Sequence, residues 1–167
     1  MCEPRLLGRS RVSDVLRIVV DTNILVSPAL KPGGNPDTLL RRWIAGEFLI
    51  VTCPTAIAEL SDVLNRPRIR EKYHLTDQDI QDFVRQFSRQ AILVPGTSVS
   101  GIVLPDPKDD MFISCAVEGR ARYIISGDHH LQELRRHGRI CIRTVARFLR
   151  TLERLERWRS LPGQYSR

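Results

Sequence analysis

No hydrophobic run in this sequence is long enough to cross a membrane. The longest apolar stretches, which include Arg17–Val20 and Phe48–Cys53, are of strand length, whereas a membrane-spanning helix needs about 20 apolar residues. The first residues, Met1–Arg17, include basic side chains but no apolar segment of the kind that marks a secretory signal peptide. We therefore expect a protein that neither enters a membrane nor is exported.

Cysteine is scarce, and its spacing favours no metal site. The four cysteines, Cys2, Cys53, Cys115 and Cys141, include no C-x-x-C pair. Three of them lie inside apolar runs, which predicts buried, reduced thiols and a cytoplasmic protein. No spacing of His and Cys supports a zinc site. Any metal that the chain binds is therefore expected to have other ligands.

Lysine is scarce as well, although the chain is basic. Of the 26 basic residues only Lys31, Lys72 and Lys108 are Lys, and the formal net charge is +7. Such a charge favours a polyanionic partner: nucleic acid, an acidic membrane surface or an acidic protein. Arg binds phosphate bidentately and stacks on bases, so its abundance suits contact with RNA. A GC-rich genome explains the same abundance, and composition does not decide between the two.

The hydrophobic pattern alternates between strands and helices along 167 residues, which suits one domain. The expected strands are Arg17–Asp21, Phe48–Cys53, Ala91–Val94, Arg122–Ser126 and Arg139–Ile142. The expected helices are Asn23–Leu30, Pro36–Gly46, Pro54–Arg66, Thr76–Gln90, Lys108–Gly119, His130–His137 and a last one from the Thr144 cap to Arg157. This order predicts an α/β fold, a single-domain α/β/α sandwich with a central, mostly parallel twisted sheet. The domain should span 17–158, with an extension at 1–16 and a tail at 159–167.

Four acidic residues fall where an open parallel sheet binds ligands, beyond the carboxyl ends of its strands. Asp21 closes the first strand, and Asp128 follows the strand in YIISGD. Asp110 lies in the first turn of its expected helix, where the macrodipole favours a carboxylate. Glu59 lies in the helix after FLIVTC, beside the apolar residue Leu60. We expect these acids to meet at one edge of the sheet.

Carboxylates that meet repel each other, and a divalent cation removes that cost. Ligands that are all oxygen suit Mg²⁺ or Mn²⁺ rather than Zn²⁺. Such an ion activates water and offsets charge on a phosphodiester in its transition state. A basic chain with an acidic, metal-binding pocket therefore has the layout expected of a nuclease.

Three segments in this order resemble the PIN domain: VVDTNILVS, PTAIAELSDVL and DPKDDMFISCAVEGRARYIISGDHHL. The resemblance covers roughly Ile18 to Leu149, and its most specific part is the spacing of 18 residues from Asp110 to Asp128. Each segment alone is a weak signal, whereas the three together are strong. Within the family the chain looks most like the VapC-type toxins of toxin–antitoxin pairs.

The resemblance implies a Mg²⁺- or Mn²⁺-dependent endoribonuclease with an RNA substrate, a cognate antitoxin and a homodimeric assembly. It makes Asp21, Asp110 and Asp128 the metal ligands and catalytic acids, and lets Glu59 hold a water or a second ion. Asn23 and Ser126 match the polar positions beside the acids. The adjacent acid Asp109 competes with Asp110, which the helical register with Ile113 and Ala116 favours. Asp106 and Asp109 would then help at the rim.

Other interpretations of the same residues stay open. Asp21 could cap the next helix, Asp128 could be an ordinary turn residue, and Glu59 could lie on a solvated helix face. An Asp21-nucleophile phosphatase of the haloacid-dehalogenase kind would want a second Asp where Asn23 stands. A non-catalytic RNA- or protein-binding module is a further alternative. The pair His129 and His130 suggests a metal but is more typical of an exposed turn, and the arginines of 143–159 could follow phosphate or simply face solvent.

Overall fold

The computed structural model describes residues 15–30, 33–97 and 107–160 of the chain. Its centre is a six-stranded sheet in the order β3-β2-β1-β4-β6-β5, in which every pair is parallel except β5 with β6. The strands are β1 (Arg17–Val20), β2 (Leu49–Thr52), β3 (Ile92–Leu93), β4 (Tyr123–Ile125), β5 (Arg136–His137) and β6 (Ile140–Arg143). The predicted α/β sandwich with a mostly parallel sheet is confirmed.

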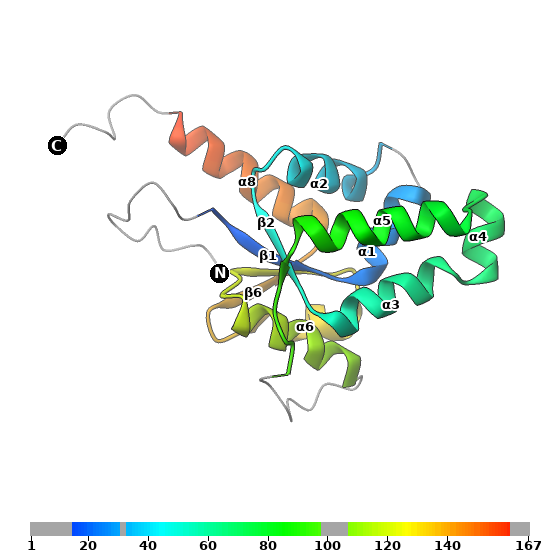
Figure 1. Ribbon diagram of the computed structural model, residues 1–167. Helices are drawn as coiled ribbons and strands as arrows, with labels where there is room; N and C mark the ends of the chain where they lie inside the picture. Colours follow the sequence, from blue (N-terminus) through cyan, green and yellow to red (C-terminus); the bar gives the residue numbers. More distant parts are fainter. Residues whose placement is uncertain (1–14, 31–32, 98–106, 161–167) are drawn as a thin grey trace.

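Helices cover both faces of this sheet (Figure 1). They are α1 (Thr22–Leu30), α2 (Asn35–Ile44), α3 (Pro54–Leu64), α4 (Pro67–Tyr73), α5 (Asp77–Gln90), α6 (Pro107–Glu118), α7 (His129–Leu134) and α8 (Val145–Arg159). Because side chains alternate along a strand, Ile18 and Val20 face one apolar core while Val19 faces the other. The first core is closed by α1, α2, α3, α5 and α8, and the second by α6 and α7.

The order of the strands reverses at β1. The chain runs from β1 to β2 and β3 on one side, then returns to place β4 on the other side of β1. In open parallel sheets such a reversal opens a crevice at the carboxyl ends of the two central strands. The residues that follow β1 and β4 therefore lie at the crevice where this kind of sheet binds ligands.

Two elements differ from the sequence-based expectation. The helix predicted to stop before Pro67 is followed at once by a second one, α4, with Pro67 in its first turn. None of the α4 residues is buried, so the segment lacks the apolar period that predicts a helix. The helix expected to reach His137 ends at Leu134, because Arg135 turns to a positive φ of 53° and β5 then pairs with β6 around Gly138.

The cysteine prediction is only partly right. Cys53 and Cys115 are free and fully buried. Cys141 is disulfide-bonded, so the expectation of reduced thiols is wrong for this residue. Its burial, with 7% exposed, matches the apolar run that contains it, but burial alone does not set the redox state of a thiol.

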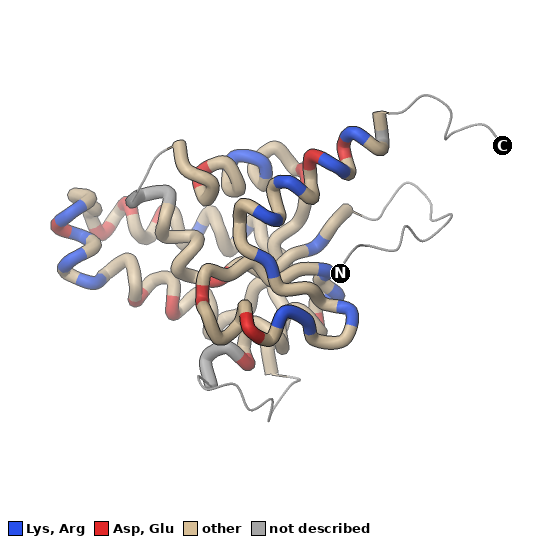
Figure 2. Tube along the Cα trace, turned by 180° about the vertical axis from the view of Figure 1, so that it is seen from behind, with Lys and Arg blue, Asp and Glu red and all other residues tan. Residues whose placement is uncertain are grey.

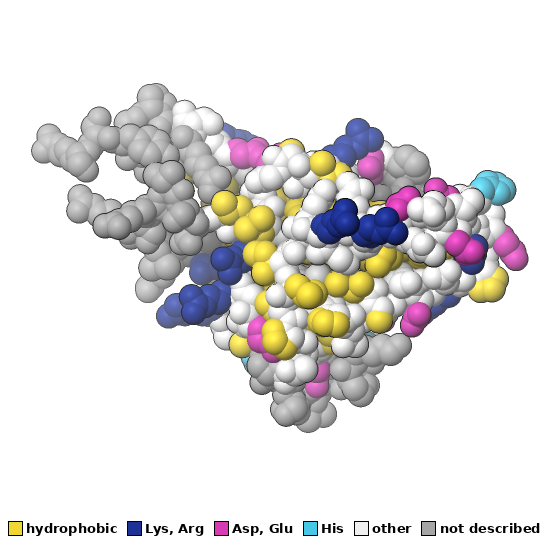
Figure 3. Space-filling model, viewed as in Figure 1, with side chains coloured by type: hydrophobic (Ala, Val, Ile, Leu, Met, Phe, Trp, Pro, Cys, Tyr) yellow, Lys and Arg dark blue, Asp and Glu magenta, His cyan; other side chains and the backbone are white. Residues whose placement is uncertain are grey.

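Apolar side chains also reach the surface on the face that α3 and α5 occupy, where they form a band between the two helices (Figure 3). Ile57 of α3 and the α5 residues Phe83 and Val84 are partly buried hydrophobic side chains that pack against the first core. In the part of the chain that is described, no helix is both long and apolar enough to span a membrane. The predicted extension and tail fall mainly on 1–14 and 161–167, outside the described residues.

Candidate functional site

Asp21 lies directly after β1, at the reversal of the sheet. Its backbone N–H donates to the carbonyl of Ile125 at 2.9 Å, which extends the β1–β4 pairing by one residue. Its side chain Oδ1 accepts from the N–H of Asn23 at 2.9 Å, so Asp21 does cap α1. Capping alone does not account for its burial: only 4% of Asp21 is exposed, whereas capping carboxylates normally face water. The carboxylate is thus held in a fixed position, inside the crevice.

Ser126 joins the ends of β1 and β4. It is completely buried, and its hydroxyl donates to Asp21 Oδ2 at 2.5 Å. The hydroxyl oxygen of Ser126 also accepts from the N–H of Asp128 at 2.9 Å. The Ser126 hydroxyl therefore links two of the predicted acids, Asp21 and Asp128, through hydrogen bonds. Asn23 contributes differently: its backbone amide contacts Asp21, while its side chain is exposed.

Asp128 is the N-cap of α7. Its Oδ1 accepts from the N–H of His130 at 2.7 Å and, at 3.4 Å, from that of Leu131. The alternative that the sequence leaves open for Asp128 is an ordinary turn residue, whereas in the structure its side chain caps a helix. The cap uses Oδ1 and orients the carboxylate beside Ser126, at the same edge as Asp21.

Glu59 reaches this edge from α3 through Thr22. The Thr22 hydroxyl donates to Glu59 Oε2 at 2.9 Å, and Thr22 itself is 2% exposed. Glu59 is half-buried rather than on a solvated face. The sequence analysis did not single out Thr22; the available signal was a hydroxyl residue directly after Asp21, at the end of an apolar strand.

Asp110 lies in the first part of α6, which packs on β1, β2 and β4. Because α6 leads into β4 of a parallel sheet, its N-terminal end lies at the carboxyl edge of the strands. Asp110 Oδ1 is buried and has no hydrogen-bond partner among the described residues. A buried carboxylate oxygen without a partner is costly, which points to a group that the described residues do not supply. Asp109 belongs to the same turn, but its side chain and the whole of Asp106 lie outside the described residues.

The carboxyl group of Asp21 is close enough to Glu59 and Asp128 for their charges to affect its pKa. Burial raises the pKa of the Asp21 carboxyl above its ordinary value, and the hydrogen bonds from Ser126 and Asn23 oppose this rise. The negative charges of Glu59 and Asp128 raise the pKa further. A cation placed among these oxygens would remove both the burial cost and the repulsion. The set is all oxygen, which fits a hard divalent ion such as Mg²⁺ or Mn²⁺.

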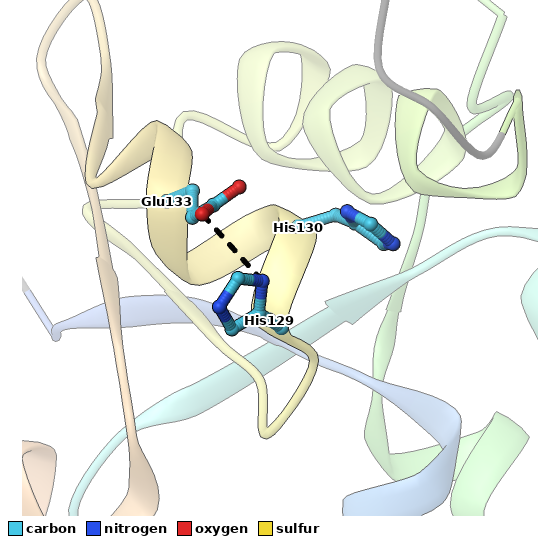
Figure 4. A group of neighbouring side chains, drawn as sticks. All are labelled: His129, His130 and Glu133. Carbon is cyan, nitrogen blue, oxygen red and sulfur yellow. Dashed lines mark ion pairs between the residues drawn. The ribbon is translucent and has the colours of Figure 1, made fainter.

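A second group of possible metal ligands lies on α7, directly after Asp128. His129, His130 and Glu133 bring one ligand atom each within 4.8 Å of the others, and all three are exposed (Figure 4). His129 Nδ1 lies 3.6 Å from Glu133 Oε1, one turn along the helix. Two imidazoles suit Zn²⁺ better than Mg²⁺. This group therefore differs in chemistry from the carboxylates behind it, and its exposure fits the histidine turn expected from the sequence.

Known proteins share the sequence pattern and the fold of this chain. The PIN domain family profile matches residues 17–130. "Uncharacterized protein MJ1680" from Methanocaldococcus jannaschii is 30% identical over 121 residues, which are 72% of this chain and 76% of the relative. A crystal structure of VapBC2 from Rickettsia felis bound to a DNA fragment from their promoter shares the fold, with a TM-score of 0.51 at 14% identity over 77% of this chain and 98% of that chain. The chain therefore belongs to the PIN domain family.

Proposed function

We propose that this protein is a Mg²⁺- or Mn²⁺-dependent endoribonuclease that hydrolyses RNA phosphodiester bonds with water and without a covalent intermediate. The observation that carries the proposal is the buried carboxylate of Asp21, whose pKa is raised by burial and by the charges of Glu59 and Asp128. Membership of the PIN family supports it, since PIN domains are generally nucleases. The net charge of +7 supports a polyanionic substrate.

Each residue of the site would have a role that follows from its position. Asp21, Asp110 and Asp128 would hold the ion, with Glu59 beside them. When bound, the ion supplies an activated water and offsets the charge that develops on the phosphodiester. Ser126 and Thr22 would position Asp21 and Glu59 through their hydroxyl hydrogen bonds of 2.5 and 2.9 Å. Asn23, Asp106 and Asp109 would assist at the rim.

We further propose that the protein is the cytoplasmic toxin of a type II toxin–antitoxin pair. The fold that it shares with VapBC2 supports this assignment. The partner would be an antitoxin whose C-terminal segment enters the acidic groove, with an Arg paired to the carboxylates. The apolar band between α3 and α5 offers a surface for a protein partner, and a homodimer is expected from the family (Figure 3).

The deciding experiment measures cleavage of a labelled RNA by purified protein with Mg²⁺, with Mn²⁺ and with EDTA. Asp21→Asn keeps the size of the side chain and removes its charge, so it should abolish metal-dependent cleavage. Asp62→Asn, an exposed acid of α3, is the matched control and should cleave as the wild type does. Equal cleavage by wild type and Asp21→Asn would reject the assignment.

Two rivals make different predictions. A phosphatase of the haloacid-dehalogenase kind, with Asp21 as nucleophile, would want a second Asp two residues on, where this chain has Asn23. Trapping a beryllofluoride adduct on Asp21 would nevertheless establish it. A non-catalytic binding module would bind RNA tightly, and divalent metal would change neither its binding nor its stability.

A further inference from the structure

Helix α8 presents a row of arginines on the side opposite its apolar face. The apolar residues Val145, Phe148, Leu149 and Leu152 are buried in the first core. The arginine row consists of Arg147, Arg150, Arg154 and Arg157, all exposed. These arginines are 3, 4 and 3 residues apart, so at about 100° per residue they lie within roughly 80° of the helix circumference. Figure 2 shows basic segments following one another along this helix toward the C-terminus.

The stability of α8 does not explain this row. Neighbours three and four residues apart on a helix repel when they carry like charge, so the row makes the helix less stable. Arg147 also lies in the first turn, where the helix dipole disfavours a positive charge. Of the two glutamates on α8, Glu156 is ion-paired with Arg42 of α2. The like charges of Arg147 and Arg150, one turn apart, thus have a cost in the folded chain that an external anion would remove.

The row starts beside the candidate site. Strand β6 ends at Arg143, whose carbonyl accepts from the N–H of Ser126 at 3.0 Å, and Ser126 in turn contacts Asp21. Thr144 then caps α8 by accepting from the N–H of Arg147 at 3.3 Å. Helix α8 therefore begins at the edge of the sheet where the acids lie and leads away from it for about 15 Å between Arg147 and Arg157.

We propose that Arg147, Arg150, Arg154 and Arg157 bind the phosphate backbone of single-stranded RNA that extends from the acidic site along α8. The inference rests on the proposed function, which places the cleaved phosphate at the acids. Arginine pairs bidentately with phosphate, and a stretch of about 15 Å matches on the order of four phosphates of a stacked strand. An acidic protein is the competing partner for a basic helix; RNA is favoured because its cleaved phosphate would lie at the acids, at the edge of the sheet where α8 begins.

The test measures binding without cleavage, by fluorescence anisotropy of a labelled single-stranded RNA in EDTA between about 50 and 200 mM salt. The row variant carries all four substitutions Arg147→Gln, Arg150→Gln, Arg154→Gln and Arg157→Gln. The control variant loses four exposed arginines at α4 and α5 instead, through Arg66→Gln, Arg68→Gln, Arg85→Gln and Arg89→Gln. Both variants lose the same net charge, so only the position differs.

For the row variant we expect the slope of log K against log salt to become shallower by about 3, and the affinity at 0.1 M salt to fall at least about tenfold. The control should change the slope by less than about 1. Equal losses in the two variants, or none in either, would overturn the inference. So would capture of an acidic protein by the row while RNA affinity stays unchanged. Thermal unfolding checks that the row variant folds, since removal of repulsion should leave or raise its Tm.

These measurements distinguish failure of the proposed nuclease activity from failure of the proposed RNA binding by the arginine row. If the wild type binds RNA through the row but does not cleave it with Mg²⁺ or Mn²⁺, the proposed enzyme is rejected and the arginine row stands. If the wild type cleaves RNA and the row variant binds and cleaves as the control does, the row is rejected and the enzyme stands.

Discussion

The hydroxyl of Ser126 donates a hydrogen bond of 2.5 Å to Oδ2 of Asp21, and so ties the residue after β4 to the residue after β1. Both side chains are buried, and they lie where the strand order of the sheet reverses. The same oxygen of Ser126 accepts from the N–H of Asp128. One small side chain thereby fixes the relative positions of two acids that repel each other.

We predict that Ser126→Ala lowers both stability and activity. The substitution leaves the partly buried N–H of Asp128 without its acceptor and removes one hydrogen bond to Asp21, at a cost of about 1–3 kcal/mol in the free energy of unfolding. Urea denaturation measures this loss, and cleavage of labelled RNA should slow about tenfold or more as the acids lose their spacing. Ser88→Ala, which removes a hydroxyl bonded to Val84 on α5, is the control and should leave cleavage unchanged.

Asp21→Asn should make the metal-free protein more stable while it abolishes activity. The pKa of Asp21 is raised in the folded state, so the folded chain binds a proton that the unfolded chain has released. Its contribution to stability is therefore lost as the pH rises above 3.8, its ordinary value, through the raised folded pKa. Asparagine has no such charge. A gain of about 1 kcal/mol would raise Tm by about 2–4 °C in a domain of this size.

The pH dependence separates this explanation from others. In EDTA, the difference in unfolding free energy between Asp21→Asn and wild type should grow from acid to neutral pH. A difference that is constant over this range would show that the charge of Asp21 is not what destabilises the wild type.

Asp110→Asn tests the buried oxygen on α6. Oδ1 of this residue has no hydrogen-bond partner within the described part of the chain, so we expect metal to stabilise the wild type and the variant to lose most of that effect. At a concentration of metal about 100 times Kd the stabilisation should approach 2.7 kcal/mol. Calorimetric titration with Mn²⁺ and thermal unfolding with and without EDTA measure it. Asp82→Asn on the exposed side of α5 should respond to metal as the wild type does, and an equal response by Asp110→Asn would exclude Asp110 from the metal site.

Features that depend on neighbours in the sequence can be predicted from it, whereas features that depend on tertiary packing cannot. Asp21 and Asp128 were predicted at strand ends because an apolar run and its last residue are neighbours in sequence. The contact between Thr22 and Glu59 joins residues 37 positions apart, through the packing of α1 on α3, and no local pattern reports it. The same limit applies to β5, whose two residues are a strand only because β6 pairs with them.

Thr22→Val is the sharpest test of a positioning role. Valine keeps the shape of the buried side chain and removes only the hydroxyl that donates to Glu59. We expect the fold to persist, with a loss of about 1 kcal/mol, and kcat for RNA cleavage to fall about tenfold because Glu59 is no longer held. KM should change little, since Thr22 is 2% exposed and offers almost no surface for contact with RNA. Thr22→Ser restores the hydroxyl and should recover kcat; if it stays as slow as Thr22→Val, packing rather than the hydrogen bond explains the loss.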